Sequence, residues 1–167
     1  RPDKGRVVLL CQPSEENGQG AARVLEDNKF DALRPDYVFA LHNLPGFPAG
    51  AVVLRKGTFA AASKGMINRL YGKTAHAGEP ENGLTPAPAM AGIIQQLTAL
   101  ADNDAFEDFT LTTIIHARLG EIAFGTTPGY AEVMATLRTY SNADMDKLTR
   151  QSVDVVERMV HSYGLKS

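Results

Sequence analysis

Two adjacent glutamates, Glu15 and Glu16, follow an unbroken apolar run in the stretch VVLLCQPSEENGQG. Neighbouring carboxylates on an extended or turning backbone point in different directions, so they can take different chemical roles. One carboxylate can bind a divalent metal ion while the other accepts a proton from a metal-bound water. A neutral imidazole is a natural further ligand for zinc, and His42 ends the next apolar run. These three residues are candidates for a hydrolytic metal site.

Two other interpretations of the glutamate pair compete with a metal site. The pair can be two solvated loop acids near a helix N-terminus, where negative charge is favoured by about 0.3–1 kcal/mol. The residue types alone leave that interpretation open. The pair can also be read as the two carboxylates of a glycosidase, which must flank the scissile bond at about 5 Å or more. Sequence neighbours on one turn rarely meet that requirement, which argues against a glycosidase.

The candidate residues follow segments that are typical of an α/β unit. Val7–Cys11 is apolar on both faces, as is expected of a strand inside a parallel sheet. Residues 18–27 have the pattern of a helix, and Tyr37–Leu41 is a second apolar run. In open α/β sheets, ligand sites form just past the carboxyl ends of the strands. Residues 1–60 are therefore predicted to be part of a metal-binding domain with a parallel sheet.

The character of the chain changes after Gly57, and the small residues at 58–65 are typical of a hinge or linker. Beyond it the pattern predicts an α+β unit. Its expected elements are a strand at 66–71, a helix beginning near Pro86 and Pro88, strands at 109–119 and 133–139 that form an antiparallel pair, and a helix at 144–163 ended by Gly164. This is a ferredoxin-like order without its last strand, which we assign to residues 64–167.

Composition excludes several classes of protein. The 167 residues are 44% hydrophobic and 22% charged, as in soluble globular proteins. A net charge of −2 argues against binding to nucleic acid or to an anionic membrane. No apolar run reaches the roughly 18 residues that a membrane span needs. A single cysteine cannot form an internal disulfide, which agrees with a reducing compartment such as the cytoplasm.

Three stretches together resemble one known family: QPSEENGQGA, FALHNLPGFPAG and GKTAHAGEPENGLTPAPAM. The chain resembles the zinc-dependent amidohydrolases and exopeptidases, which include aminoacylases, hippurate hydrolases, auxin-conjugate hydrolases and carboxypeptidases. It is most similar to the branch that hydrolyses N-acyl amino acids. The resemblance implies a catalytic domain that binds two divalent metal ions (zinc, or manganese, cobalt or nickel). It also implies an inserted lid domain through which the protein forms a homodimer.

The same resemblance implies roles for four residues. Glu15 matches the general base, Glu16 matches a metal ligand, and His42 matches a ligand of the second metal ion. His76, in GKTAHAG, matches a lid histidine that stabilises the tetrahedral oxyanion. An imidazole or imidazolium N–H aimed at that developing charge would act as an oxyanion hole. Without the flanking match, the sequence fits an ordinary turn histidine at position 76 equally well.

Two further residues are possible substrate contacts. Arg138, in TLRT, matches a recurrent arginine of the family that can hold a substrate carboxylate, but a surface ion pair explains it equally well. The strand at 109–119 alternates, so His116 is predicted on the face opposite Leu111 and Ile115. There His116 is either merely solvent-facing or in contact with substrate or a dimer partner.

The resemblance also implies that metal ligands lie outside this chain, namely a histidine motif and a bridging aspartate before it and a histidine after it. The whole protein is therefore expected to hydrolyse an N-acyl amino acid or small peptide at its amide bond through a metal-bound water. Residues 1–167 alone are expected to be inactive. The alternative is a non-catalytic protein, in which residues 64–167 serve as a dimerisation module and the rest is a remnant.

Overall fold

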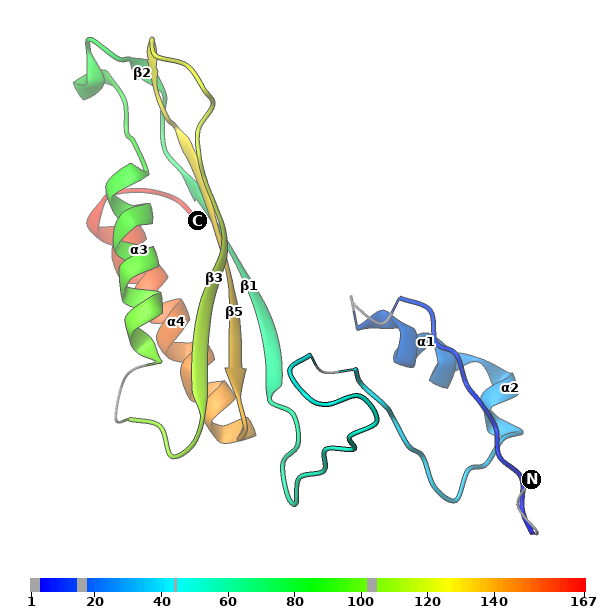
Figure 1. Cartoon of the computed structure of the whole chain (residues 1–167). Coiled ribbons are helices and arrows are strands. Elements are labelled where there is room, and N and C mark those ends of the chain that lie inside the picture. The colour runs from blue at the N-terminus through cyan, green and yellow to red at the C-terminus, as the bar shows by residue number, and fades with distance from the viewer. Residues whose placement is uncertain (1–3, 15–17, 44, 102–104) are drawn as a thin grey trace. The chain divides into compact units, whose positions relative to one another are not determined.

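The computed structural model describes residues 4–14, 18–43, 45–101 and 105–167. The chain divides into two compact units, residues 1–52 and residues 53–167 (Figure 1). None of the helices in these described ranges combines the length and apolarity that a membrane span requires.

The second unit is an antiparallel sheet with two helices on one of its faces (Figure 1). The sheet has the order β1-β5-β3, and a two-stranded sheet, β2-β4, extends beyond one end of it. The bounds are β1 Ala62–Tyr71, β2 Ala75–His76, η2 Pro80–Asn82, α3 Ala87–Leu100, β3 Thr110–Leu119, β4 Thr126–Thr127, β5 Tyr130–Thr139 and α4 Asn142–Ser162. The predicted helices and the predicted antiparallel pair, β3 with β5, are confirmed. β1 begins inside the segment that was expected to be a linker.

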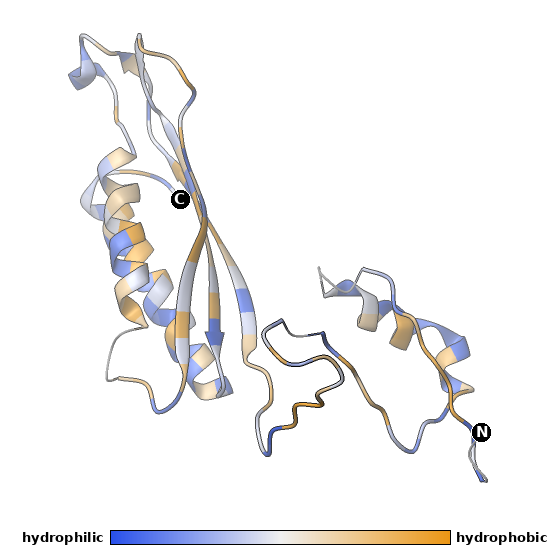
Figure 2. Ribbon diagram, in the orientation of Figure 1, coloured by the Kyte–Doolittle hydropathy of each residue, from blue (hydrophilic) through white to orange (hydrophobic). Residues whose placement is uncertain are grey.

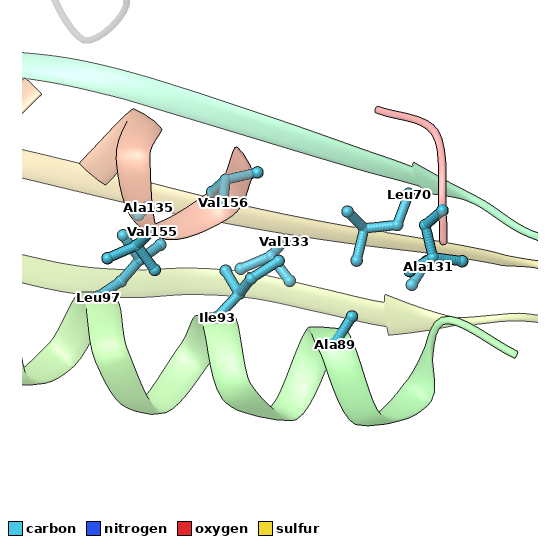
Figure 3. Packing of buried hydrophobic residues seen from close by; sticks show 10 residues of the cluster. Leu70, Ala89, Ile93, Leu97, Ala131, Val133, Ala135, Val155 and Val156 are labelled. Carbon is cyan, nitrogen blue, oxygen red and sulfur yellow. The ribbon is translucent and has the colours of Figure 1, made fainter. Parts of the chain in front are cut away.

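A closed apolar core lies between this sheet and its helices. Leu97 and Ile93 on α3 and Leu70 on β1 are fully buried, and Figure 3 shows the α3 side chains directed at Val133 and Ala135 of β5. Burying one such aliphatic side chain contributes about 1.5–3 kcal/mol. The buried core therefore stabilises the packing of the helices on the sheet in the second unit.

Local signals set the ends of α4. The Ser141 hydroxyl accepts a hydrogen bond from the Asp144 amide at 3.2 Å, which satisfies one of the free N–H groups of the first turn. At the other end Gly164 adopts φ 63°, in the left-handed region that favours glycine. Both ends agree with the helix predicted over 144–163 within two residues.

The predicted face of β3 is wrong, and a β-bulge is the reason. The register pairs Ile114 with Ala135 and His116 with Met134, so Ile115 has no partner residue on β5. The bulge shifts the alternation by one residue, and His116 therefore lies on the same face of the sheet as Leu111. The residues that face the helices in the first half of the strand are Thr110, Thr112 and Ile114, whereas Phe109, Leu111 and Ile115 are exposed.

The first unit contains two short helices, α1 Gln19–Glu26 and α2 Asn28–Asp31. The helix predicted over 18–27 is confirmed, but the strands predicted at Val7–Cys11 and Tyr37–Leu41 are wrong. Both segments are irregular and exposed, and Figure 2 shows apolar residues along the irregular stretches of this unit. A strand forms only when its backbone N–H and C=O groups have a neighbouring strand to pair with. The described residues of this unit provide none, so the expected parallel sheet is not formed.

One close contact organises the first unit. Gly20, in the first turn of α1, is buried, and a Cβ atom there would lie 1.8 Å from the carbonyl oxygen of Pro13. The start of α1 can approach the segment before the two glutamates only because residue 20 has no side chain.

In the second unit, the segment that precedes β1 is fastened to the sheet. The Arg55 guanidinium donates a hydrogen bond to the Tyr140 hydroxyl at 2.8 Å and lies 4.8 Å from the centre of the Tyr140 ring. The Tyr140 ring also contacts the ring of Phe109, and the two ring centres are 4.9 Å apart. The contact between Arg55 and the Tyr140 ring is a cation–π interaction, and it holds the segment before β1 against the sheet.

Candidate active site

The predicted base and ligand, Glu15 and Glu16, lie outside the described residues. The described residues on either side of them turn sharply. Ser14 has φ 55° and Gly18 has φ 72°, both in the left-handed region. That conformation is uncommon for a residue with a side chain such as Ser14.

His42, the predicted metal ligand of the first unit, is exposed and has one ring nitrogen engaged. Its Nδ1 lies 3.0 Å from the carbonyl oxygen of Asn43. Because a carbonyl oxygen only accepts hydrogen bonds, this contact requires the proton to be on Nδ1. In the neutral ring this leaves the lone pair on Nε2, which is the form in which an imidazole binds a metal ion.

The metal ions implied by the resemblance can be tested against this donor. No group of three or more His, Cys, Asp or Glu side chains gathers anywhere in the described ranges. A single imidazole with a free Nε2 fits one position of a zinc site, and a glutamate carboxylate fits another. The chain therefore offers fitting donors but not a full ligand set within its described residues.

His76 belongs to the second unit, where β2 pairs it with Thr126 of β4. Its Nδ1 accepts a hydrogen bond from the backbone N–H of Gly78 at 3.1 Å. A backbone N–H only donates, so Nδ1 is unprotonated in this contact and the neutral ring carries its proton on Nε2. His76 therefore has the opposite tautomer to His42: one imidazole presents an N–H and the other presents a lone pair.

At the tip of the second unit, residues 72–84 and 120–129, hydrogen bonds fix the backbone on either side of His76. The Ala77 amide donates to the Gly125 carbonyl at 2.9 Å, and the Ala75 amide donates to the Thr127 hydroxyl at 2.9 Å. Three glycines let neighbouring segments approach so closely that a Cβ atom would lie within 3.0 Å of them: Gly72, Gly83 and Gly129. The importance of these glycines was not predicted, although the density of glycines from Gly72 to Gly83 is a signal of tight turns.

The two possible substrate contacts lie elsewhere on the second unit. His116 faces Glu132, with its Nε2 3.9 Å from a carboxylate oxygen. Arg138 is exposed and pairs across the sheet with Ser63 and Leu111, near the end where β5 finishes. β2 and β4 leave the sheet at its other end. The structure therefore does not bring His76 together with either residue.

Glu132 is the centre of an ion cluster on the sheet face opposite the helices. It accepts hydrogen bonds from Arg69 Nε at 3.0 Å and from the Tyr130 hydroxyl at 3.1 Å. Burial, followed by the hydrogen bond to Glu132, raises the pKa of Tyr130, and the hydrogen bond to Glu132 raises the pKa of Arg69. Both hydrogen bonds reach the same oxygen, Oε2, so the Glu132 carboxylate links β1 to β5 across the sheet.

The sequence matches one family over almost its whole length. The peptidase family M20/M25/M40 matches residues 1–164. The N-acetyl-L-cysteine deacetylase of Bacillus subtilis is 31% identical over 170 residues, which cover 98% of this chain and 39% of the relative. The N-acetyldiaminopimelate deacetylase of Exiguobacterium sibiricum is 29% identical over 161 residues, which cover 96% of this chain and 43% of the relative.

Two solved structures share the fold of part of this chain. The aminobenzoyl-glutamate utilization protein from Klebsiella pneumoniae matches 72% of this chain and 30% of its own, with a TM-score of 0.60 and 24% identity. A hydantoinase/carbamoylase family amidase from Burkholderia ambifaria matches 65% of this chain and 27% of its own, with a TM-score of 0.58 and 23% identity. The chain spans about 40% of the length of the curated relatives.

Proposed function

The chain belongs to peptidase family M20/M25/M40, and we propose that it is part of an amidohydrolase that removes the acyl group from an N-acyl amino acid. The observation that carries the proposal is the similarity to deacetylases of N-acetyl amino acids, which extends over 96–98% of this chain. Because the chain spans about 40% of those relatives, the activity is proposed for the whole protein and not for residues 1–167 alone.

The chain's own residues would supply a base, two metal ligands and an oxyanion donor. Two divalent metal ions, when bound, would polarise the amide carbonyl and the attacking water. The free Nε2 of His42 and the carboxylate of Glu16 would each hold one position in that site. The remaining ligands would come from parts of the protein outside this chain.

The reaction needs two proton movements, and Glu15 is the proposed carrier for both. Water adds to the amide carbonyl carbon and loses a proton to the Glu15 carboxylate. The carbon–nitrogen bond then breaks, and Glu15 gives that proton to the departing amine. The products are the free amino acid and the carboxylic acid of the acyl group, so the added water is fully accounted for. The Nε2–H of His76 would donate to the negative oxygen that forms between the two steps.

We further propose that the second unit is the lid and that the protein is a homodimer. The outer sheet face carries exposed large apolar side chains, namely Ile67, Tyr71, Leu111 and Ile115, and β1 and β3 are edge strands. An open sheet edge is a template for pairing with another chain. The same features favour the second candidate function, a dimerisation module without catalysis.

The test compares a longer natural form of the protein with residues 1–167, using a panel of N-acetyl amino acids and detection of the released amine. We expect turnover by the longer form, loss of turnover with a chelator, and no turnover by residues 1–167 with added zinc or manganese. Glu15→Gln should lower kcat by about 10²–10⁴-fold, the usual share of a general base. His161→Gln, in the last turn of α4, is the matched control and should leave kcat unchanged. A longer form that dimerises but never releases amine would favour the module instead.

A further inference from the structure

We propose that the backbone N–H of Gly78 fixes His76 as a neutral imidazole with its proton on Nε2, which makes Gly78 a positioning residue for an oxyanion donor. The sequence leaves open whether His76 would act as an imidazole or as an imidazolium. The inference rests on the proposed function for the identity of the oxyanion, but the tautomer can be measured on its own.

The first observation is the direction of one hydrogen bond. Gly78 N lies 3.1 Å from His76 Nδ1, and an amide nitrogen in a peptide has no lone pair to offer. Protonation of Nδ1, whether in the other tautomer or in the imidazolium, would place two hydrogens between these atoms. The contact therefore holds only while Nδ1 is bare and the ring is neutral.

The second observation is that the tight turn delivers this N–H to the ring. The Glu79 amide donates to the His76 carbonyl at 3.0 Å, which closes a four-residue turn over 76–79. Within this turn, residue 78 is brought back over the side chain of residue 76. The amide of Ala77 is already bonded to Gly125, so the turn is tied to the neighbouring segment.

The third observation concerns the missing side chain at position 78. A Cβ atom there would lie 3.2 Å from Nδ1 and 3.4 Å from Cε1 of the His76 ring. The first of these contacts is tight, so a methyl group would fit only if the ring or the turn shifted by a few tenths of an ångström. Glycine supplies the same N–H as any residue except proline, and it also leaves the ring its present position without such a shift.

The consequence for chemistry is a neutral donor. His76 is exposed, so its Nε2–H is open to a ligand, and a neutral N–H can stabilise a forming oxyanion without first holding a positive charge. The ligand class is the negative oxygen of a tetrahedral adduct, or the carbonyl oxygen that precedes it. His42 has its ring nitrogens in the reverse arrangement, with the proton on Nδ1 and the lone pair outward. The two histidines are thus prepared for opposite tasks, metal ligation and hydrogen-bond donation.

The test is nuclear magnetic resonance of residues 1–167 with ¹⁵N-labelled histidine at neutral pH. The chain has four histidines, and His76→Gln assigns the signal by its loss. We expect His76 to show a protonated Nε2 and a bare Nδ1, with a scalar coupling across the Gly78 N–H···Nδ1 bond. A protonated Nδ1 in the wild-type chain, or an even mixture of tautomers, would overturn the proposal.

Two variants separate the N–H from the rest of the turn. Gly78→Pro removes the donor and should give a mixture of tautomers, whereas Gly78→Ala keeps the donor and should retain the Nε2–H form. The amides of Ala75 and Ala77 report whether the tip stays folded, because both are hydrogen-bonded in it. An unchanged tautomer in Gly78→Pro with a folded tip would contradict the proposal. Should Gly78→Pro unfold the tip, the coupling in the wild-type chain decides.

A second experiment uses a longer form that turns over an N-acetyl amino acid. In glutamine the amide nitrogen can lie near the place of Nε2, whereas in asparagine it lies near Nδ1. We therefore expect His76→Asn to lower kcat by about 10²–10³-fold, as the loss of one oxyanion donor does, and His76→Gln to recover at least about tenfold of that with little change in KM. Equal losses in both variants would contradict the assignment to Nε2. Absence of turnover in every longer form would reject the proposed function and leave the tautomer result standing.

Discussion

Residues 53–167 contain a closed core of packed apolar side chains, whereas most of the large apolar side chains described in residues 1–52 are exposed. Leu70 and Leu97 in the second unit have no exposed surface. In the first unit Leu9 is 90% exposed, Phe39 is 87% exposed and Leu41 is 97% exposed.

The difference teaches which structures a segment can form by itself. A helix satisfies its backbone groups within its own segment, so α1 forms inside the range predicted for it, one residue shorter at each end. A strand takes its partners from other segments. The second unit contains three strands that pair with one another, and they bury their inner face against α3 and α4. The apolar runs of the first unit have no such partners among the described residues.

The largest expected effect tests the difference between the buried leucines of the second unit and the exposed leucines of the first. Leu97→Ala removes a fully buried side chain and should lower the free energy of unfolding of the second unit by about 2–5 kcal/mol. Leu41→Ala removes the same atoms from an exposed position in the first unit. It should change the free energy of unfolding of the protein by less than about 0.5 kcal/mol. Urea denaturation of both variants measures the difference. Similar losses in both would mean that the first unit buries Leu41 in solution.

A smaller effect is expected when a glycine in a helix of each unit is replaced by alanine. In Gly20→Ala the new Cβ would lie 1.8 Å from a backbone oxygen of Pro13, which should cost about 1–3 kcal/mol. In Gly92→Ala, on α3, the nearest atom is the mobile methyl end of Met159, at 2.2 Å. The gain in helix propensity, up to about 1 kcal/mol, offsets the cost of moving that methyl group.

Amide hydrogen exchange measures this pair of variants. Gly20→Ala should speed exchange in the rest of α1 and leave α3 unchanged, while Gly92→Ala should change exchange in α3 only slightly. If Gly92→Ala proved the more damaging of the two, the Met159 side chain would have to be held more rigidly than a flexible thioether usually is.

The smallest expected effect concerns pH and the charged face of the second unit. Burial and the hydrogen bond to Glu132 raise the pKa of Tyr130 above the ordinary value of 10.0. The folded state therefore holds this proton more tightly than the unfolded state. The resulting stabilisation is complete below about pH 10 and is lost as the pH rises through the raised pKa.

Unfolding of wild-type protein and Tyr130→Phe, measured from about pH 8 to pH 11, tests this. The wild type should lose more stability than the variant over the upper part of that range, because only the wild type has this proton to release. Glu132→Gln should remove part of the difference, since burial is the larger cause of the raised pKa. Parallel curves for wild type and Tyr130→Phe would refute the prediction.

The sequence predicts the second unit well because its signals are local. Apolar spacing places α3, Ser141 and Gly164 mark the two ends of α4, and alternation identifies β5. The face of His116 was mispredicted because a bulge at Ile115 is a tertiary adjustment between strands and leaves no periodic trace. The strands of the first unit were mispredicted because an apolar run indicates a preference for pairing and cannot supply the partner.

The candidate site divides in the same way. Residue types and a family resemblance make His42 and His76 candidate site residues, and the comparisons place the chain in a family with deacetylase relatives. The tautomers could not be predicted, because they depend on which backbone atom lies beside each Nδ1. Nδ1 of His42 lies beside the carbonyl oxygen of the next residue, whereas Nδ1 of His76 lies beside the amide nitrogen of the residue two positions later. In each case the atom belongs to the peptide unit that joins the first and second residues after the histidine, and which end of that unit lies beside Nδ1 decides the chemistry that the ring offers.

The bulge in β3 also predicts where this strand tolerates a change in length. Ile114 and His116 pair with consecutive residues of β5, so deletion of Ile115 would leave both halves of β3 in their present register. Deletion of Thr113 would turn Thr112 and all residues before it to the opposite face, or else force the bulge to move. Deletion of Ile115, which gives the same sequence as deletion of Ile114, should therefore be accepted, whereas deletion of Thr113 should destabilise the sheet, and natural relatives that lack the bulge should be one residue shorter there.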